Sequence, residues 1–304
     1  MSDEKALALV PVEEPSGLES IGTYDGEAGA YEVFSLRGGP LAATETYRLY
    51  VAKLPSGQMG LMKIAQKPEH NDRLEQEART LTTLTTVANE LDTEASEAGV
   101  RAPNYGAFFP QLLESFVVDT VGRRVTFLGF HGSIASYKQL VPVAVATKDG
   151  RVDLQTGAWM IAKGAKLLDF VHALGFSIGF VDASNILLET GQHGVFALDF
   201  SEGSEDASLS ECADEVRSLA RIVWEAAGGK GDVKPPHDVS VMTAEQYEEF
   251  TAFVRDLMTK SWNAGDVVTA LYEHADKIWP KVAIEGNPAL GMKRQFHPWA
   301  ILPR

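Results

Sequence analysis

The chain has 304 residues, of which 45% are hydrophobic and 23% are charged, and its formal net charge is −15. A chain of this length can bury a substantial core, so we expect a globular protein of two lobes or two small domains. The acidic excess disfavours the phosphate backbone of nucleic acid as the main partner and favours a neutral or basic protein partner.

Cys212 is the only cysteine, which excludes a disulfide framework and a cysteine-based zinc site. The seven histidines show no metal-ligand spacing, so we expect no structural metal. No apolar run reaches the length that spans a bilayer, and the N-terminus is acidic where a secretory signal needs basic residues. The sequence therefore predicts a cytoplasmic protein that is not embedded in a membrane.

The first part of the chain predicts a tail followed by a β-rich lobe. Residues 1–30 hold seven acidic residues against one lysine, and we expect an acidic, mobile N-terminal segment there. Over residues 31–130, five runs have strand character: "YEVFSL", "TYRLYVAKL", "QMGLMKIA", "PQLLESFVVD" and "RRVTFLGF". Between the third and fourth runs, Leu74, Ala78, Leu81 and Leu84 recur at helical intervals, with Asn71 or Asp72 as the expected cap.

The remainder of the chain predicts mostly helices over residues 131–282. Long helices are expected for "LQTGAWMIAKGAKLLDFVHAL" and "ECADEVRSLARIVWEAAGG", with a hairpin of "NILLE" and "VFALDF" between them. Residues 283–304 form a separate C-terminal tail with basic residues (Lys293, Arg294, Arg304) among aromatic ones. We expect this tail to pack on the acidic body, with nucleic-acid binding as the alternative.

Several motifs in one order carry a resemblance to a known family. Residues 171–188, "VHALGFSIGFVDASNILL", align without gaps with "LHSLGIVHGDIKPSNILL", the catalytic-loop consensus of protein kinases. Upstream are a strand lysine, Lys63 in "GLMKIA", and a helix glutamate, Glu77 in "LEQEARTLTTL"; downstream, "ALDFSEG" places Asp199 on the Asp-Phe-Gly aspartate. Over residues 31–282 the chain thus resembles the protein kinase-like superfamily, and is similar to a bacterial-type pseudokinase that lacks the catalytic-loop aspartate.

The resemblance implies an α+β fold of two lobes, with a β-rich N-lobe that contains one long helix and a mostly helical C-lobe. It implies ATP or ADP with Mg²⁺ as cofactors. Lys63 and Glu77 would pair and hold the nucleotide phosphates, while Asn185 and Asp199 would hold the metal ion. We therefore expect Lys63 and Glu77 to lie close enough to pair.

The catalytic residues depart from the family pattern. Ile178, Gly179 and Phe180 replace the triplet that ends in the catalytic aspartate, and phenyl accepts no proton. Asp182 stands where the family usually has a lysine beside the γ-phosphate.

Other parts of the expected machinery are reduced as well. The region of the glycine-rich loop offers only Gly38 and Gly39, and the activation segment is short and lacks an Ala-Pro-Glu motif. Glu215 aligns with the aspartate that braces the loop, and Asp214 is adjacent, so either residue or neither is the brace.

Three functions remain open at this point. The first is a regulatory pseudokinase that binds ATP and Mg²⁺ and acts through a protein partner. The second is an atypical transferase, such as an AMP-transferase, with Asp182 as its catalytic carboxylate in place of Phe180. The third is a small-molecule kinase of the aminoglycoside or choline type, against which the loss of the aspartate counts.

Overall fold

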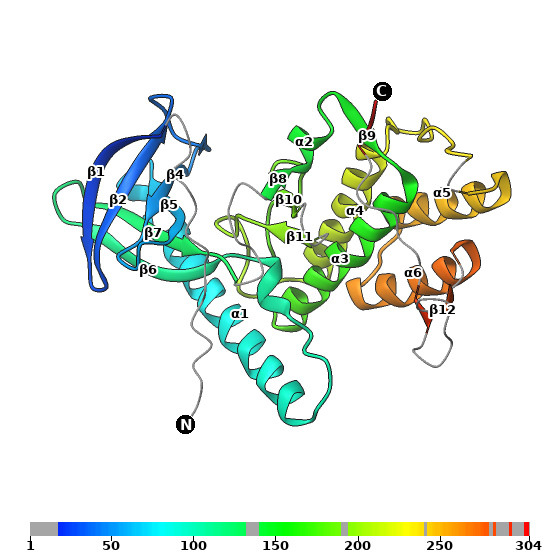
Figure 1. Cartoon of the computed structure of the whole chain (residues 1–304), viewed down its shortest axis with the longest axis horizontal. Helices are drawn as coiled ribbons and strands as arrows, with labels where there is room; N and C mark the ends of the chain where they lie inside the picture. The colour runs from blue at the N-terminus through cyan, green and yellow to red at the C-terminus, as the bar shows by residue number, and fades with distance from the viewer. Residues whose placement is uncertain are drawn as a thin grey trace. The chain divides into compact units, whose positions relative to one another are not determined.

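The computed structural model describes residues 18–131, 140–189, 194–239, 242–279, 282–283, 292–293 and 301–303. The chain divides into two compact units, one of residues 1–140 and 196–205 and the other of residues 141–195 and 206–304. The first unit holds the large sheet and one long helix, and the second holds the other long helices (Figure 1).

The first unit is an antiparallel sheet accompanied by helix α1. Its strands follow the order β1-β2-β4-β5-β7-β6, and the short β3 also pairs with β4. The elements are β1 (Leu18–Gly26), β2 (Gly29–Leu36), β3 (Ala42–Ala43), β4 (Tyr47–Lys53), β5 (Met59–Ala65), α1 (Asn71–Glu97), β6 (Gln111–Val118) and β7 (Arg123–Gly129). Short 3₁₀ turns at Pro68–His70 and Tyr105–Phe108 flank α1. All five predicted strands are thus present.

Strand β1 lies within the region for which composition predicted a mobile tail through residue 30. It pairs along β2, and the turn between them is held by Glu114 of β6, which accepts hydrogen bonds from the Glu27 backbone N–H (2.5 Å) and the Tyr31 hydroxyl (2.6 Å). Most β1 side chains are exposed, so the segment has the polar composition of a tail although its backbone is paired. Residues 1–17 of the expected tail lie outside the described residues.

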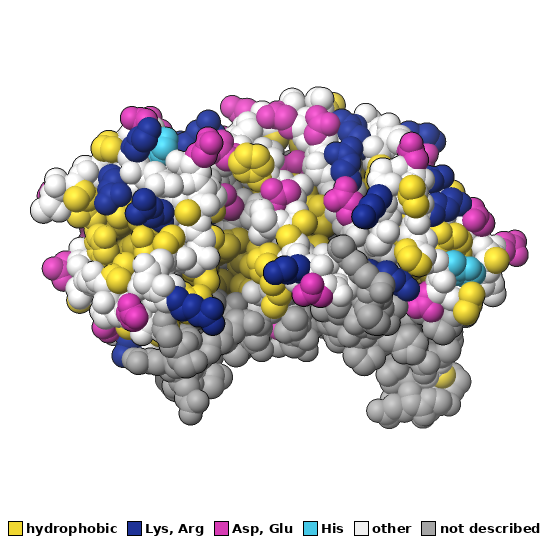
Figure 2. All heavy atoms as spheres, turned by 90° about the horizontal axis from the view of Figure 1, so that it is seen from above, with side chains coloured by type: hydrophobic (Ala, Val, Ile, Leu, Met, Phe, Trp, Pro, Cys, Tyr) yellow, Lys and Arg dark blue, Asp and Glu magenta, His cyan; other side chains and the backbone are white. Residues whose placement is uncertain are grey.

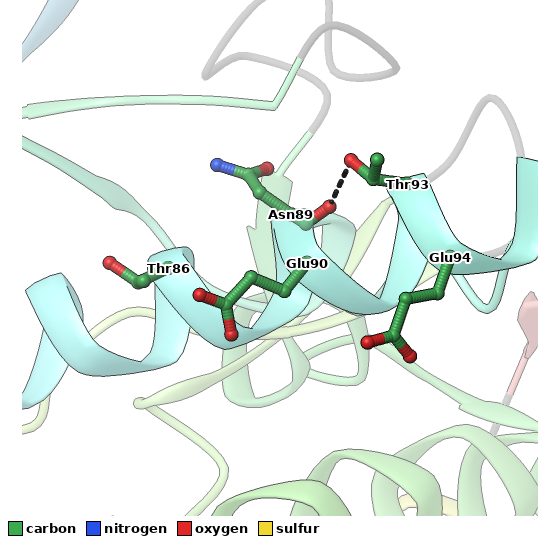
Figure 3. A pocket seen from close by; sticks show the side chains of 5 residues that line it. All are labelled: Thr86, Asn89, Glu90, Thr93 and Glu94. Atoms are coloured by element: carbon green, nitrogen blue, oxygen red, sulfur yellow. Dashed lines mark hydrogen bonds between the residues drawn. The ribbon is translucent and has the colours of Figure 1, made fainter. Parts of the chain in front are cut away.

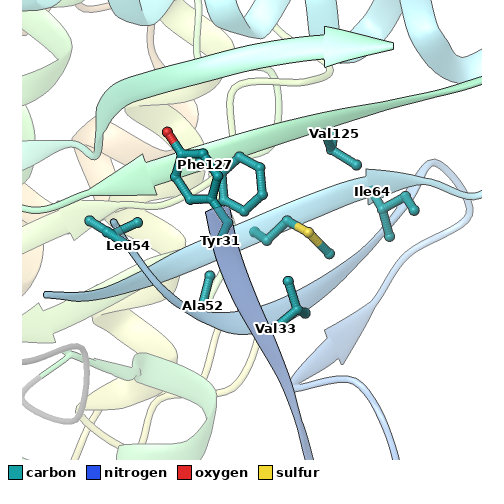
Figure 4. Close-up of a cluster of buried hydrophobic side chains, with 8 residues drawn as sticks. Tyr31, Val33, Ala52, Leu54, Ile64, Val125 and Phe127 are labelled. Atoms are coloured by element: carbon teal, nitrogen blue, oxygen red, sulfur yellow. The ribbon is translucent and has the colours of Figure 1, made fainter. Parts of the chain in front are cut away.

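The two faces of the sheet carry different kinds of side chain. One face carries a cluster of buried side chains, several of which are drawn in Figure 4: Tyr31, Val33, Ala52, Leu54, Met62, Ile64, Val125 and Phe127. Because neighbouring residues of a strand point to opposite faces, Lys63 belongs to the other face, opposite Leu49 of β4 and Thr126 of β7. The sequence alternation of β5 therefore directs one lysine away from the apolar cluster.

Helix α1 buries the stripe that its sequence predicted. Leu74, Ala78, Leu81 and Leu84 are all buried, and α1 packs against β6 and β7. The expected cap is different: His70 is the N-cap, without a side-chain hydrogen bond. Asn71 instead donates to the Gly122 carbonyl (2.9 Å) and accepts from the Arg124 backbone N–H (2.7 Å). Its side chain thus ties the start of α1 to the turn between β6 and β7.

In the second unit, α3 packs against α4 and α6, and α5 packs against α4 and α6. The helices are α2 (Val143–Ala146), α3 (Leu154–Ala173), α4 (Leu209–Ala226), α5 (Ala244–Thr259) and α6 (Ala264–Ile278). The strands are β8 (Leu140–Pro142), β9 (Gly150–Val152), β10 (Ile186–Glu189), β11 (Gly194–Ala197), β12 (Val282–Ala283), β13 (Met292–Lys293) and β14 (Ile301–Pro303), of which β8 and β11 extend across the boundary between the units. Within the described ranges, each helix is too short or too polar to cross a bilayer.

Most of the predicted C-terminal tail lies outside the described residues. The parts that are described form short strands, in which Val282–Ala283 pairs with Met292–Lys293 and Ile301–Pro303 pairs with Gly150–Val152. Of the basic residues named for the tail, Lys293 is in β13, and Arg294 and Arg304 are not described. The interpretation of this tail stays a prediction.

The link between α1 and the β6–β7 turn predicts a loss of stability in Asn71→Ala. Two hydrogen bonds to backbone groups are removed, which should lower the free energy of unfolding by about 1–3 kcal/mol. Urea unfolding measures this. Asn89→Ala on the exposed face of the same helix is the matched control and should change stability by less than about 0.5 kcal/mol. Equal effects of the two substitutions would contradict the assigned role of Asn71.

Candidate functional site

Lys63, Glu77 and Asp199 meet inside the first unit. The Lys63 ammonium donates to Glu77 Oε1 at 2.5 Å and to Asp199 Oδ1 at 2.8 Å. Lys63 and Glu77 have no exposed surface, and Asp199 is buried as well. The predicted pairing of Lys63 with Glu77 is present, and the structure adds Asp199 as a second anionic partner of the same ammonium.

The strands and α1 explain why these three groups converge. Lys63 lies within β5, and Glu77 lies in the buried stripe of α1, one turn from Leu74 and Leu81. Asp199 follows β11, and the next residue, Phe200, donates its backbone N–H to Glu77 Oε1 at 2.9 Å. Each carboxylate is thus placed by a separate element, and the lysine joins them.

Burial and mutual attraction oppose each other in this group. Burial acts to lower the pKa of Lys63, but Asp199 and Glu77 outweigh it and raise that pKa above its usual range. Burial acts to raise the pKa of Asp199, but Lys63 and the hydrogen bonds of Lys63 and Ser201 lower it below its usual range. For Glu77, burial is decisive and raises its pKa to about 7. One ammonium therefore faces two carboxylates, of which Glu77 is the more readily protonated.

The segment after Asp199 is attached to α1 at several points. Gln76 donates to the Gly203 carbonyl (2.6 Å), Arg79 pairs with Glu205 (2.9 Å), and Arg73 pairs with Glu202. Helix α4 already begins at Leu209. The segment is thus short, as the sequence indicated, and its first half belongs to the first unit with α1.

In the second unit, Glu215 braces the loop that aligns with the kinase catalytic loop. Its Oε1 accepts the Gly179 backbone N–H at 2.7 Å, and its Oε2 lies 2.7 Å from His172 Nε2. Asp214 instead pairs with Arg217 at the surface of α4. The choice that the sequence left open between the two acidic residues is therefore settled in favour of Glu215.

The same loop contains the other predicted site residues. Asp182 Oδ1 accepts hydrogen bonds from the Ser184 backbone N–H (2.8 Å), the Ser184 hydroxyl (2.6 Å) and the Asn185 backbone N–H (2.8 Å). Asn185 donates its side-chain N–H to the Phe180 carbonyl at 2.6 Å. Phe180 is 53% exposed. Asp182 thus stabilises the turn that carries Asn185, and its catalytic assignment stays a prediction.

Gly38 and Gly39 serve a tight turn. Leu36 and Gly39 exchange two backbone hydrogen bonds, and Arg37 and Gly38 have φ angles of 52° and 80°. Two successive residues in the left-handed region are typical of a type I′ hairpin turn. These glycines therefore close a hairpin, and this region has no long flexible glycine loop.

A shallow pocket on α1 is distinct from these residues. It is lined by Thr86, Asn89, Glu90, Thr93 and Glu94, which share one face of the helix (Figure 3). Its lining contains two carboxylates and none of the predicted site residues. The residues predicted from the sequence for a functional site lie elsewhere, in the buried group around Lys63 and in the loop of the second unit.

Comparisons with solved structures identify the architecture. The chain is similar to the crystal structure of the BubR1 kinase domain, with a TM-score of 0.55, 11% identity, and coverage of 88% of this chain and 86% of that one. It also resembles two double mutants of the Mycobacterium tuberculosis PknI kinase domain. For C20A_R136A the TM-score is 0.52, with 13% identity and coverage of 87% and 100%; for C20A_R136N it is 0.51, with 12% identity and coverage of 86% and 96%.

The chain has the protein kinase-like fold. The predicted fold class, α+β with a sheet-rich lobe and a helical lobe, is thereby confirmed. No protein-family model and no curated protein matches the sequence significantly. At 11–13% identity the likeness concerns the fold alone.

Tyr47 contacts Lys63 and His172 contacts Glu215, although neither contact was predicted from the sequence. Tyr47 begins β4, is buried, and places its ring centroid 4.5 Å from the Lys63 ammonium. In the β4–β5 hairpin, Leu49 pairs with Lys63, so Tyr47 shares the face of Lys63. His172 lies at the end of α3, and only the three-dimensional structure reveals its contact with Glu215.

Removing the ammonium should destabilise the first unit strongly. Lys63→Met leaves the Glu77 and Asp199 carboxylates buried without their cation, which should lower the free energy of unfolding by about 3–5 kcal/mol. Lys67→Met is the control, because Lys67 pairs with Glu69 at the surface; it should change stability by less than about 0.5 kcal/mol. Chemical unfolding of both variants checks the difference, and a small loss in Lys63→Met would contradict the buried ion-pair assignment.

The raised pKa of Glu77 predicts a specific pH dependence. Between its ordinary value of 4.5 and about 7, Glu77 is protonated in the folded chain and ionised in the unfolded chain. The unfolded chain then binds fewer protons, so this residue lowers the free energy of unfolding as pH rises through that window. Tyr47, Lys63 and Asp199 are the titratable groups that act on it.

Glu77→Gln removes this titration while keeping the shape of the side chain. The stability of the wild type minus that of Glu77→Gln should therefore fall between about pH 4.5 and about pH 7. Urea unfolding at several pH values measures it. A difference that stays constant or rises would show that Glu77 is ionised throughout.

Proposed function

We propose that this chain is a pseudokinase: a kinase-like domain that does not transfer phosphate and acts through binding to a protein partner, in a regulatory role. The observation that carries the proposal is Phe180, which stands at the position of the catalytic aspartate and is 53% exposed. A phenyl group can neither orient a substrate hydroxyl by hydrogen bonding nor accept its proton. At the position of the family's lysine, Asp182 adds a negative charge where transfer of a phosphoryl group needs a positive one.

The short segment after Asp199 supports the same proposal. Residues 200–208 separate Asp199 from α4, and Glu202, Gly203 and Glu205 are engaged with α1. A segment of this length, with several residues already bonded to α1, has little free surface on which a peptide substrate could bind. The intact brace of Glu215 on Gly179 supports a loop that keeps its conformation after losing its catalytic carboxylate.

ATP or ADP with Mg²⁺ is the ligand whose chemistry fits the remaining residues. Lys63 is a cation for phosphate oxygens, and Asp199 and Asn185 supply the carboxylate and amide oxygens that Mg²⁺ prefers. When bound, the metal ion would neutralise phosphate charge. The buried state of Lys63 means that this residue must gain exposed surface before it can contact a ligand. We therefore propose weak nucleotide binding that depends on opening of the site.

A protein partner with a neutral or basic surface fits the net charge of −15. On the face shown in Figure 2, acidic and basic side chains are interspersed among the described residues, so this face presents no continuous basic stripe for nucleic acid. Because the proposed function includes no substrate, the partner would be identified by its binding to this chain and not by a reaction.

Labelled ATP tests the proposal directly. The protein is incubated with cell extract and ATP labelled at the α or the γ phosphate, beside an active kinase as a positive control. We expect transfer of neither label by the wild type, and none by Phe180→Asp, because Asp182 still repels the transferred group.

Two outcomes would contradict this expectation in different ways. Transfer of the γ label that is lost in Asp199→Asn and kept in Asp182→Asn would show a phosphotransferase that works without the usual aspartate. Transfer of the α label that is lost in Asp182→Asn would show an AMP-transferase with Asp182 as its carboxylate.

A further inference from the structure

The Tyr47 ring lies against the Lys63 ammonium beside its hydrogen-bond partners. An ammonium has three N–H donors, and those of Lys63 are directed at Glu77 Oε1 (2.5 Å), Asp199 Oδ1 (2.8 Å) and the Leu198 carbonyl (3.5 Å). The Tyr47 ring lies over the same nitrogen at 4.5 Å, within the range of a cation–π contact. The ammonium is therefore fully surrounded by groups of its own chain.

Tyr47 also lies in the field of the charged groups. Burial, reinforced by the negative charges of Asp199 and Glu77, raises the pKa of Tyr47 above its usual range, so the phenol stays neutral. The side chain is 4% exposed. Tyr47 is thus a buried, neutral neighbour of the ammonium that a phosphate would need.

The backbone around Tyr47 links it to the segment after Asp199. The Tyr47 N–H donates to the Thr44 hydroxyl at 3.1 Å, and the neighbouring Thr46 donates its hydroxyl to Glu202 Oε1 at 3.0 Å. The Thr46 carbonyl accepts the Gln66 backbone N–H at 2.8 Å. Tyr47 is the first residue of β4, so a movement at this strand end would release the ring without breaking the rest of the strand.

Electrostatics favours the covered state when no ligand is bound. Ionised, the group of Lys63, Glu77 and Asp199 carries one positive and two negative charges, all buried. A phosphate brought to Lys63 in this state would add negative charge where carboxylates already dominate. Tyr47 is neutral and adds an attractive ring face instead.

We propose that Tyr47 is a gate over Lys63, and that a phosphate-bearing ligand reaches the ammonium only after the Tyr47 side chain has moved away. Only the chemical nature of this ligand rests on the proposed function. The covering of Lys63 by Tyr47 is a property of the chain itself and can be tested without any nucleotide.

The first experiment measures access to the Lys63 amine in the full-length chain. An amine-reactive acylating reagent is applied, and modification of each lysine is followed by mass spectrometry. In Tyr47→Val, which suits a strand, we expect Lys63 to be modified at least about tenfold faster than in the wild type, whereas exposed Lys67 keeps its rate. Tyr47→Phe retains the ring and should increase the rate less.

Tyr50→Ala is the matched control. Tyr50 lies on the same strand but packs against the apolar cluster of the opposite face, so its removal should leave the modification of Lys63 unchanged. Circular dichroism and melting establish that each variant is folded; if Tyr47→Val is not, Tyr47→Leu takes its place with the same expectation. Equal modification of Lys63 in the wild type and the folded Tyr47 variant overturns the gate, as does an equal increase in Tyr50→Ala.

The second experiment adds Mg²⁺ and ADP and follows the melting temperature, which ligand binding to the folded state raises by mass action. We expect an apparent Kd at least about tenfold lower in Tyr47→Val than in the wild type, because the fraction of chains competent to bind is larger. Asp199→Asn in the Tyr47→Val background should abolish the shift. If Lys63 becomes accessible but no nucleotide binds, the gate stands and the nucleotide part of the proposed function fails.

Discussion

The burial of a single ammonium between two carboxylates constrains most of the first unit. Removing charged groups from water is costly unless their geometry and hydrogen bonds are nearly complete. Here the two ion pairs require β5 to place Lys63, α1 to place Glu77, and the residues after β11 to place Asp199. The attachment of residues 200–205 to α1 follows from this requirement, because Phe200 also donates to Glu77 Oε1.

In the loop of the second unit, the backbone conformation is held by residues other than Phe180. Glu215 holds the Gly179 backbone, and Asp182 organises the turn that leads to Asn185. These contacts fix the backbone on both sides of Phe180 and do not depend on its side chain. The conformation of this loop is therefore set by Glu215, Asp182 and Asn185, whichever side chain stands at position 180.

The sequence predicted those features that depend on local periodicity or on a motif. The five strands, the buried stripe of α1 and the pairing of Lys63 with Glu77 are of this kind. The choice of Glu215 over Asp214 was accessible too, because Asp214 shares the exposed side of α4 with Arg217, whereas Glu215 is one turn from buried Leu219.

Features that depend on contacts between distant parts of the chain could not be predicted from local sequence patterns. Strand β1 has an exposed, polar composition, and its order comes from pairing with β2 and from Glu114, 87 residues from Glu27. The role of Tyr47 requires the register of the β4–β5 hairpin, since a shift of one residue would place its ring in the opposite cluster. Asn71 met the compositional rule for a cap, but its side chain binds the β6–β7 turn instead.

The presence of three charged groups in this position is not explained by stability alone. Well-packed apolar side chains of similar volume often stabilise a core as well as a buried ion pair does, or better. The group also holds one more carboxylate than it has cations, and the largest effect on Glu77 is a burial that favours its protonated form. Such a cluster can change its state by gaining a proton, or by exchanging an internal partner for a ligand. Tyr47 is the partner best suited to exchange, because it is neutral and lies at the end of a strand, whereas Glu77 is fixed within a helix.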